Sequence, residues 1–176
     1  MVKTKFWEDA ARYGAYLGLA DAAFQLLNTW KPSGLLSLVH IVVIVTLLVM
    51  FTKRRVALYG AEGYSYGQCW KYIFFVSVFA GILLGAYSVV ASNFLFPEKY
   101  RELVSRSLSV VAQTGIYSDD MLRGLSGMYE KLFFSPLWVV LTNVLGAALR
   151  GAFYGLFIAA FTKREAPVFP DNNDNN

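Results

Sequence analysis

The chain has 176 residues, of which 56% are hydrophobic and 16% are charged. Soluble domains typically carry about 25% charged residues, so this chain has too few to cover a water-facing surface. The composition therefore excludes a disordered chain and argues against a conventional soluble enzyme. The net charge of +4, from 16 basic and 12 acidic residues, is too small and too scattered to indicate a nucleic-acid groove.

Four apolar segments follow one another along the chain, at 8–30, 34–51, 70–96 and 134–161. The cleanest, GLLSLVHIVVIVTLLVMF at 34–51, has His40 as its only ionisable residue. A run of this length and composition is typical of a transmembrane helix. We predict an all-α, polytopic membrane protein with four transmembrane helices in a single membrane domain, 1–166. The polar tail, 167–176, is predicted to be disordered.

The first segment also has some features of a cleaved signal peptide, with Lys3 and Lys5 ahead of it and small residues around Asp21. Its apolar part is weak and is crowded by Arg12 and Asp21. We therefore favour an uncleaved first helix.

All four tryptophans fall at the ends of predicted helices, where an amphipathic indole prefers the headgroup region of the bilayer. They are Trp7, Trp30, Trp70 and Trp138. Pro32 and Pro136 lie just before or inside the first turn of the second and fourth helices, where a missing N–H costs nothing. Both prolines are therefore expected to mark helix starts.

Basic residues are more numerous on one side of the predicted membrane. With four spans both termini share a side, and that side receives nine: Lys3, Lys5, Arg12, Lys53, Arg54, Arg55, Lys71, Lys163 and Arg164. The other side receives six: Lys31, Lys99, Arg101, Arg106, Arg123 and Lys131. Because basic loops are retained in the cytoplasm, we predict that both termini are cytoplasmic.

The segment between the third and fourth spans, 97–133, is then outside the cytoplasm. Its apolar residues recur at helical spacing up to Gly115, and a second helix is expected to begin after Ser118 as its N-cap. This amphipathic pair either caps the bundle or lies on the lipid headgroups, or it offers a surface to a partner protein. The sequence leaves these alternatives open.

Small residues form stripes on three of the four predicted helices, which permits the close helix approach that drives packing in lipid. The stripes include Gly14, Gly18, Gly81, Gly85, Gly151 and Gly155. They serve contacts within one chain or between chains of a homo-oligomer, and nothing in the sequence decides between the two.

Three ionisable residues, Asp21, His40 and Arg150, fall in one layer near the bilayer centre, about 17 to 21 Å from the cytoplasmic ends of their helices. An isolated charge there costs about 2.5 to 3.5 kcal/mol, which favours an inward-facing pair of Asp21 and Arg150. Gln25 and Asn143 form a second polar layer by the same reasoning. The first layer is either a structural pair that fixes which helices are neighbours, or a functional site with a histidine that titrates near neutral pH.

No catalytic constellation is recognisable. With one cysteine, Cys69, and one histidine, a disulfide within the chain is impossible and a zinc site would lack ligands. We find no glycine-rich phosphate loop and no strand that would carry a nucleophile elbow. We therefore expect no metal, no cofactor and no catalytic residue.

Short motifs in a particular order resemble those of a known family. GYSYGQ at 63–68 enters the third span, FPEKY at 96–100 leaves it, Ser135 and Pro136 open the fourth, and a basic residue followed by Glu165 closes it. Over residues 8–166 this order resembles the bacterial four-helix membrane family catalogued as domain of unknown function 4199. The resemblance implies a bacterial cytoplasmic-membrane protein, and it supplies no activity, cofactor or site residue.

The leading functional hypothesis is therefore a non-enzymatic accessory or interaction subunit that contacts the lipid bilayer and a protein partner or further copies of itself. The alternative is a carrier or channel component for a small ion or lipid headgroup, which would use the layer of Asp21, His40 and Arg150. An intramembrane enzyme ranks third.

Overall fold

The structure is a computed structural model that describes residues 5–165. Within these residues the chain is all-α, as the composition predicted. It forms six α-helices: α1 Phe6–Trp30, α2 Gly34–Ala57, α3 Tyr66–Val90, α4 Pro97–Gln113, α5 Asp119–Phe134 and α6 Pro136–Thr162. A short 3-10 turn, Gly60–Glu62, follows α2, and a π-helical turn, Ala91–Leu95, joins α3 to α4. The tail predicted to be disordered lies outside the described residues.

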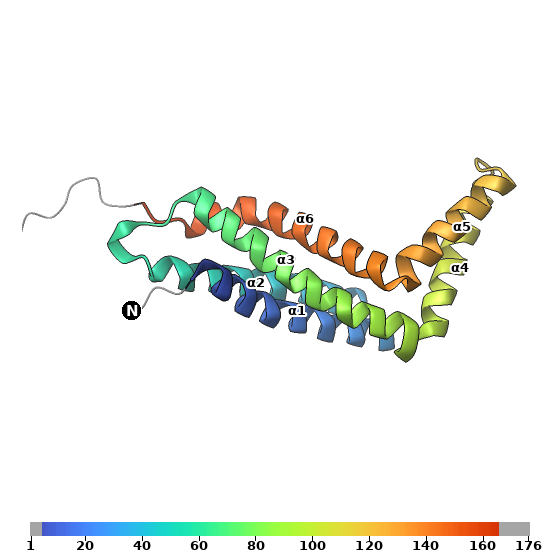
Figure 1. The fold of residues 1–176 in the computed structure, drawn as a ribbon, viewed down its shortest axis with the longest axis horizontal. Helices are drawn as coiled ribbons and strands as arrows, with labels where there is room; N and C mark the ends of the chain where they lie inside the picture. The colour runs from blue at the N-terminus through green and yellow to red at the C-terminus, as the bar shows by residue number, and fades with distance from the viewer. Residues whose placement is uncertain (1–4, 166–176) are drawn as a thin grey trace, which may run out of the picture.

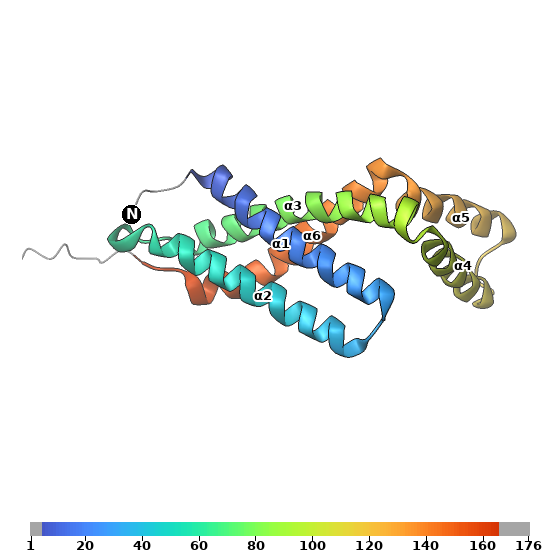
Figure 2. The same cartoon turned by 90° about the horizontal axis from the view of Figure 1, so that it is seen from below.

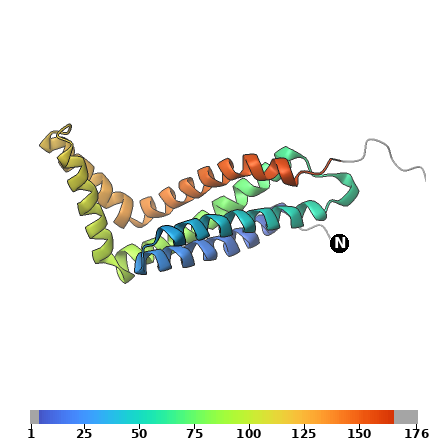
Figure 3. The same cartoon turned by 180° about the vertical axis from the view of Figure 1, so that it is seen from behind.

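Four long helices, α1, α2, α3 and α6, form a bundle, and α4 and α5 form a helical hairpin that leaves one end of it at a steep angle (Figures 1 and 3). Helix α3 packs against both α1 and α6 and is the centre of the bundle, whereas α2 lies on the outside against α1 (Figure 2). The start of α1, the connection from α2 to α3, and the end of α6 all lie at the end opposite the hairpin (Figure 1).

Three helical stretches are long and apolar enough to cross a membrane: Gly34–Ala57, Tyr66–Leu95 and Pro136–Thr162, with mean hydropathies of 2.7, 2.3 and 1.7. The chain is therefore a multi-pass membrane protein whose helices contact the lipid bilayer. Helix α1 has 25 residues and is long enough to span, but it is less apolar and is not among the three. Helix α2 is the most exposed to lipid, since only 11% of its apolar window is buried inside the bundle.

The core occupies the half of the bundle away from the hairpin. It contains Leu17 from α1, Leu48 from α2, Val76 from α3 and Ile158 from α6, each at most 5% exposed. The half of the bundle near the hairpin also holds several polar side chains, among them Asp21, Ser88 and Ser92, which are at most 4% exposed.

Glycines allow the closest helix contacts. Gly14 and Gly18 of α1 face α3, Gly81 and Gly85 of α3 face α6, and Gly151 and Gly155 of α6 face α3. A Cβ atom on Gly151 would overlap the side chain of Ser77, and one on Gly81 would lie 2.8 Å from the Cα of Val144. The six glycines of the predicted stripes therefore all serve contacts within one chain.

The end of α2 and the start of α3 differ from the expected boundaries by six and four residues, and the reasons are local. Helix α2 continues past residue 51 to Ala57, because Lys53 and Arg54 point into solvent and do not interrupt it. Helix α3 begins at Tyr66 because Ser65 and Gln68 form a capping box, in which the Ser65 hydroxyl accepts from the Gln68 N–H and Gln68 accepts from the Ser65 N–H.

The helices of the hairpin begin and end at residues that favour helix boundaries. Pro97 is the first residue of α4, Gly115 adopts a positive φ of 66° after the helix ends, and the Ser118 hydroxyl accepts from the Met121 N–H at 3.4 Å to cap α5. Helix α5 has no buried residue. The hairpin base is attached to α1, since Lys99 donates to the Thr29 carbonyl at 2.8 Å.

Candidate functional site

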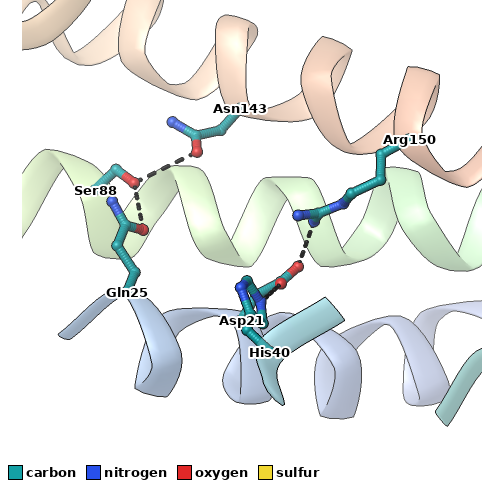
Figure 4. A network of polar contacts seen from close by, with 6 residues as sticks. All are labelled: Asp21, Gln25, His40, Ser88, Asn143 and Arg150. Carbon is teal, nitrogen blue, oxygen red and sulfur yellow. Dashed lines mark hydrogen bonds and ion pairs between the residues drawn. The ribbon is translucent and has the colours of Figure 1, made fainter. Parts of the chain in front are cut away.

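Asp21 is the centre of a polar cluster inside the bundle (Figure 4). Its side chain is only 1% exposed. One carboxylate oxygen lies 2.6 Å from the Nε2 atom of His40 on α2, and the other accepts from a terminal nitrogen of Arg150 on α6, also at 2.6 Å. The structure thus brings together the three ionisable residues that the sequence placed in one layer, and Asp21 links three helices through both oxygens.

His40 and Arg150 are less buried than Asp21. The His40 side chain is 26% exposed and stacks on the Phe24 ring, with centroids 4.8 Å apart. The Arg150 side chain is 33% exposed, and its only hydrogen bond to any described residue is the one to Asp21. Because a guanidinium carries five N–H donors, most donors of Arg150 have no acceptor among residues 5–165.

A cavity of about 250 Å³ adjoins the cluster. All four bundle helices contribute to its lining: Asp21, Phe24, Gln25, Asn28, Leu36, Ser37, His40, Leu84, Asn143 and Arg150. A second hollow of about 350 Å³, between α3 and α6, also reaches Arg150. Arg150 therefore lines both hollows.

A second polar layer, formed by Gln25, Ser88 and Asn143, lies beside the cluster (Figure 4). The Ser88 hydroxyl lies 3.2 Å from the side-chain Oε1 atom of Gln25 and 3.5 Å from the side-chain Oδ1 atom of Asn143, and it donates its single proton to one of them at a time. Gln25 also donates to the Tyr100 hydroxyl at 3.2 Å. These contacts join α1, α3 and α6 to the first turn of α4, and a further cavity of about 320 Å³ lies beside them.

A buried ion pair at the opposite end of the bundle was missed by the sequence analysis. Arg55, counted there as a loop residue, lies in the last turn of α2 and is 2% exposed. It donates to the Asp9 carboxylate at 2.8 Å and to the hydroxyls of Tyr64 and Tyr59, both at 3.2 Å. Burial raises the pKa of the Tyr64 phenol above its ordinary value, although the hydrogen bond from Arg55 acts in the opposite direction.

The spacing of residues in α2 contained the missing signal. Ile44, Leu48 and Thr52 recur every four residues and are all at most 2% exposed, and Arg55 continues the same buried stripe. Counting Arg55 among the basic loop residues hid this periodicity. The residue is also enclosed by aromatic rings, with Tyr72 and Phe6 centroids 5.1 and 5.2 Å from its guanidinium carbon.

The tryptophans do not all have the same environment. Trp7, Trp30 and Trp138 are 55%, 75% and 46% exposed at the ends of their helices. Trp70 is half-buried and donates its indole N–H to the Ala152 carbonyl at 3.0 Å, so it also joins α3 to α6. Among residues 5–165 there is no group of three His, Cys, Asp or Glu side chains placed to hold a metal ion.

The bundle and its internal polar cluster define a polytopic α-helical membrane protein with a helical hairpin at one end. The chain belongs to the family described as "Protein of unknown function (DUF4199)", whose match covers residues 12–164. Neither the curated proteins nor the solved structures contain a match to the chain.

Proposed function

We propose that the protein is a non-enzymatic accessory subunit of the bacterial cytoplasmic membrane that presents the α4–α5 hairpin as its interaction surface. The observation that carries this proposal is the exposure of large apolar side chains on the hairpin. Helix α5 has no buried residue, and large apolar side chains of the hairpin are 44% to 77% exposed. They are Leu103, Val110, Ile116, Tyr117, Met121 and Met128. We infer from this exposure that the hairpin contacts a partner.

The proposal includes a four-span topology with both termini in the cytoplasm. Three of the polar residues that make α1 less apolar are turned inward: Asp9 pairs with Arg55, Asp21 with His40 and Arg150, and Gln25 with Ser88. Because these groups are satisfied inside the bundle, they do not oppose insertion of α1 beside α3. The hairpin then lies on the extracytoplasmic side.

The interaction surface is tested by changing its most exposed methionines. Met121 and Met128 are 60% and 50% exposed, so Met121→Glu with Met128→Glu leaves the bundle intact. We expect wild-type protein in native membrane nanodiscs to contain a second polypeptide, or a second copy, in fixed stoichiometry that this variant loses. Asp120→Asn on the same helix is the matched control and should retain it. Equal composition in wild type and variant, with the hairpin labelled only by lipid-soluble probes, would contradict the proposal.

A second candidate function is favoured by the cavity beside Arg150. A carrier or channel component for a small ion or lipid headgroup would use the Asp21, His40 and Arg150 cluster as its binding site. In reconstituted vesicles, Asp21→Asn and Arg150→Gln should then abolish flux at unchanged protein level. Loss of expression in both variants would instead mark the cluster as a structural link between helices.

A further inference from the structure

The charges around the 250 Å³ cavity balance only while His40 is neutral. Helix α1 contributes Asp21, α6 contributes Arg150 and α2 contributes His40, while the residue that lines the cavity from α3 is Leu84. Asp21 and Arg150 form an ion pair with a net charge of zero. A proton on His40 gives the cavity a net positive charge in surroundings of low dielectric constant, where an uncompensated charge is costly.

The free edge of Arg150 is suited to an oxyanion. One terminal nitrogen meets Asp21, and the remaining N–H donors have no acceptor among residues 5–165. A guanidinium presents its donors in a planar fork that matches the geometry of carboxylates and phosphates. Asn143 and Ser37 add polar groups to the same cavity.

We propose that this cavity binds one singly charged oxyanion against the free edge of Arg150, together with one proton on His40. The anion is either a free carboxylate or the phosphodiester of a lipid headgroup, since both offer the same oxygens to a guanidinium. The inference deepens the second candidate function by naming its ligand class. It rests on that candidate only for the site, because binding does not require the ion to cross the membrane.

Charge balance couples the two ligands. An anion that enters the neutral cluster leaves a net negative charge in the cavity, and a proton on His40 restores neutrality. Anion and proton therefore each favour the binding of the other, by the same factor. Asp21 accepts from His40 at 2.6 Å, so the carboxylate also stabilises the imidazolium once it forms.

The cavity extends from the cluster toward the hairpin end of the bundle. Asn28 lies two residues before the end of α1, Ser37 lies in the first turn of α2, and both line the cavity. The cavity therefore reaches the ends of α1 and α2 nearest the hairpin and lies away from the Asp9 and Arg55 pair. A ligand would enter from that side.

The test uses full-length protein in phosphatidylcholine nanodiscs and isothermal titration with sodium acetate at several pH values. We expect acetate affinity to rise as pH falls, with a limiting slope of one proton taken up per anion, about tenfold per pH unit. Arg150→Gln should abolish binding. Arg106→Gln, which removes an arginine whose side chain is 78% exposed on the hairpin, is the control and should bind as wild type does.

Two further variants separate the roles of the cluster. Asp21→Asn gives the cluster a positive charge without a proton, so it should bind acetate at least as tightly as wild type at low pH and without pH dependence. His40→Gln keeps a polar side chain but cannot take up the proton, and it should bind weakly at every pH. If Asp21→Asn does not fold, His40→Gln alone still tests the coupling.

Nanodiscs that contain phosphatidylglycerol distinguish the two sources of the anion. If the ligand is a lipid headgroup, wild-type protein should retain phosphatidylglycerol in native mass spectra and lose it on Arg150→Gln. Wild-type protein that binds neither acetate nor phosphatidylglycerol, or binds them without dependence on pH or on Arg150, would overturn the inference. Binding without flux in vesicles would leave the site intact and reject only the carrier function.

Discussion

Asp9 and Arg55, one near the start of α1 and the other in the last turn of α2, form a buried ion pair with 2.8 Å between carboxylate and guanidinium. Their side chains are 7% and 2% exposed. The pair closes the end of the bundle opposite the hairpin, while Asp21 and His40 join the same two helices nearer the hairpin. Helices α1 and α2 are therefore joined at two polar points, in addition to the hydrophobic core that Leu17 and Leu48 share.

Removing one partner of the Asp9 and Arg55 pair should destabilise the protein strongly. Arg55→Met leaves the Asp9 charge buried without a partner, and breaking such a pair typically costs about 3 to 5 kcal/mol. The midpoint of thermal unfolding in detergent should fall well below that of wild type, whereas exposed Lys53→Gln should leave it unchanged. Adding Asp9→Leu to Arg55→Met should restore most of the lost unfolding midpoint. If it restores none, the unpaired Asp9 charge is not the cause of the destabilisation.

Gly151 and Gly146 give a matched test of helix packing on α6. A Cβ on Gly151 overlaps Ser77, whereas one on Gly146 meets nothing within 4 Å. Gly151→Ala should separate α3 from α6 and lower the unfolding midpoint. The expected loss in the free energy of unfolding is about 1 to 3 kcal/mol, as for overpacked cores. Gly146→Ala should be neutral or stabilising, by up to about 1 kcal/mol, because alanine favours helix over glycine. Equal effects of the two substitutions would argue against this contact.

The hydrogen bond from Gln25 to the Tyr100 hydroxyl holds the hairpin base against the bundle. Tyr100→Phe keeps the ring and removes the bond, which contributes about 0.5 to 1.5 kcal/mol. Amide hydrogens in the first turns of α4 should exchange faster in this variant, and those in the centre of α3 should not. Faster exchange throughout the bundle would indicate that the whole protein is destabilised, and would contradict a local role of this bond at the hairpin base.

The sequence predicted the apolar spans and the polar layer because each has a strong local signal. Period and hydropathy locate helices, and an ionisable residue in an apolar run, such as Asp21 or Arg150, must turn inward. The partners of these residues were harder to predict, since Asp9 and Arg55 are far apart in the chain and meet only in the folded bundle. The direction of the hairpin also depends on the π-helical turn after α3, which leaves no clear pattern in the sequence.

The sidedness of three engineered cysteines tests most directly the claim that the hairpin is presented outside the cytoplasm by a four-span bundle. The native Cys69 is 0% exposed and gives little background. In sealed right-side-out vesicles, a membrane-impermeant maleimide should label Tyr117→Cys at the hairpin tip at once. Lys5→Cys and Lys163→Cys should be labelled only after permeabilisation. Labelling of Lys5→Cys in sealed vesicles would show that α1 does not span, and protection of Tyr117→Cys would contradict the placement of the hairpin.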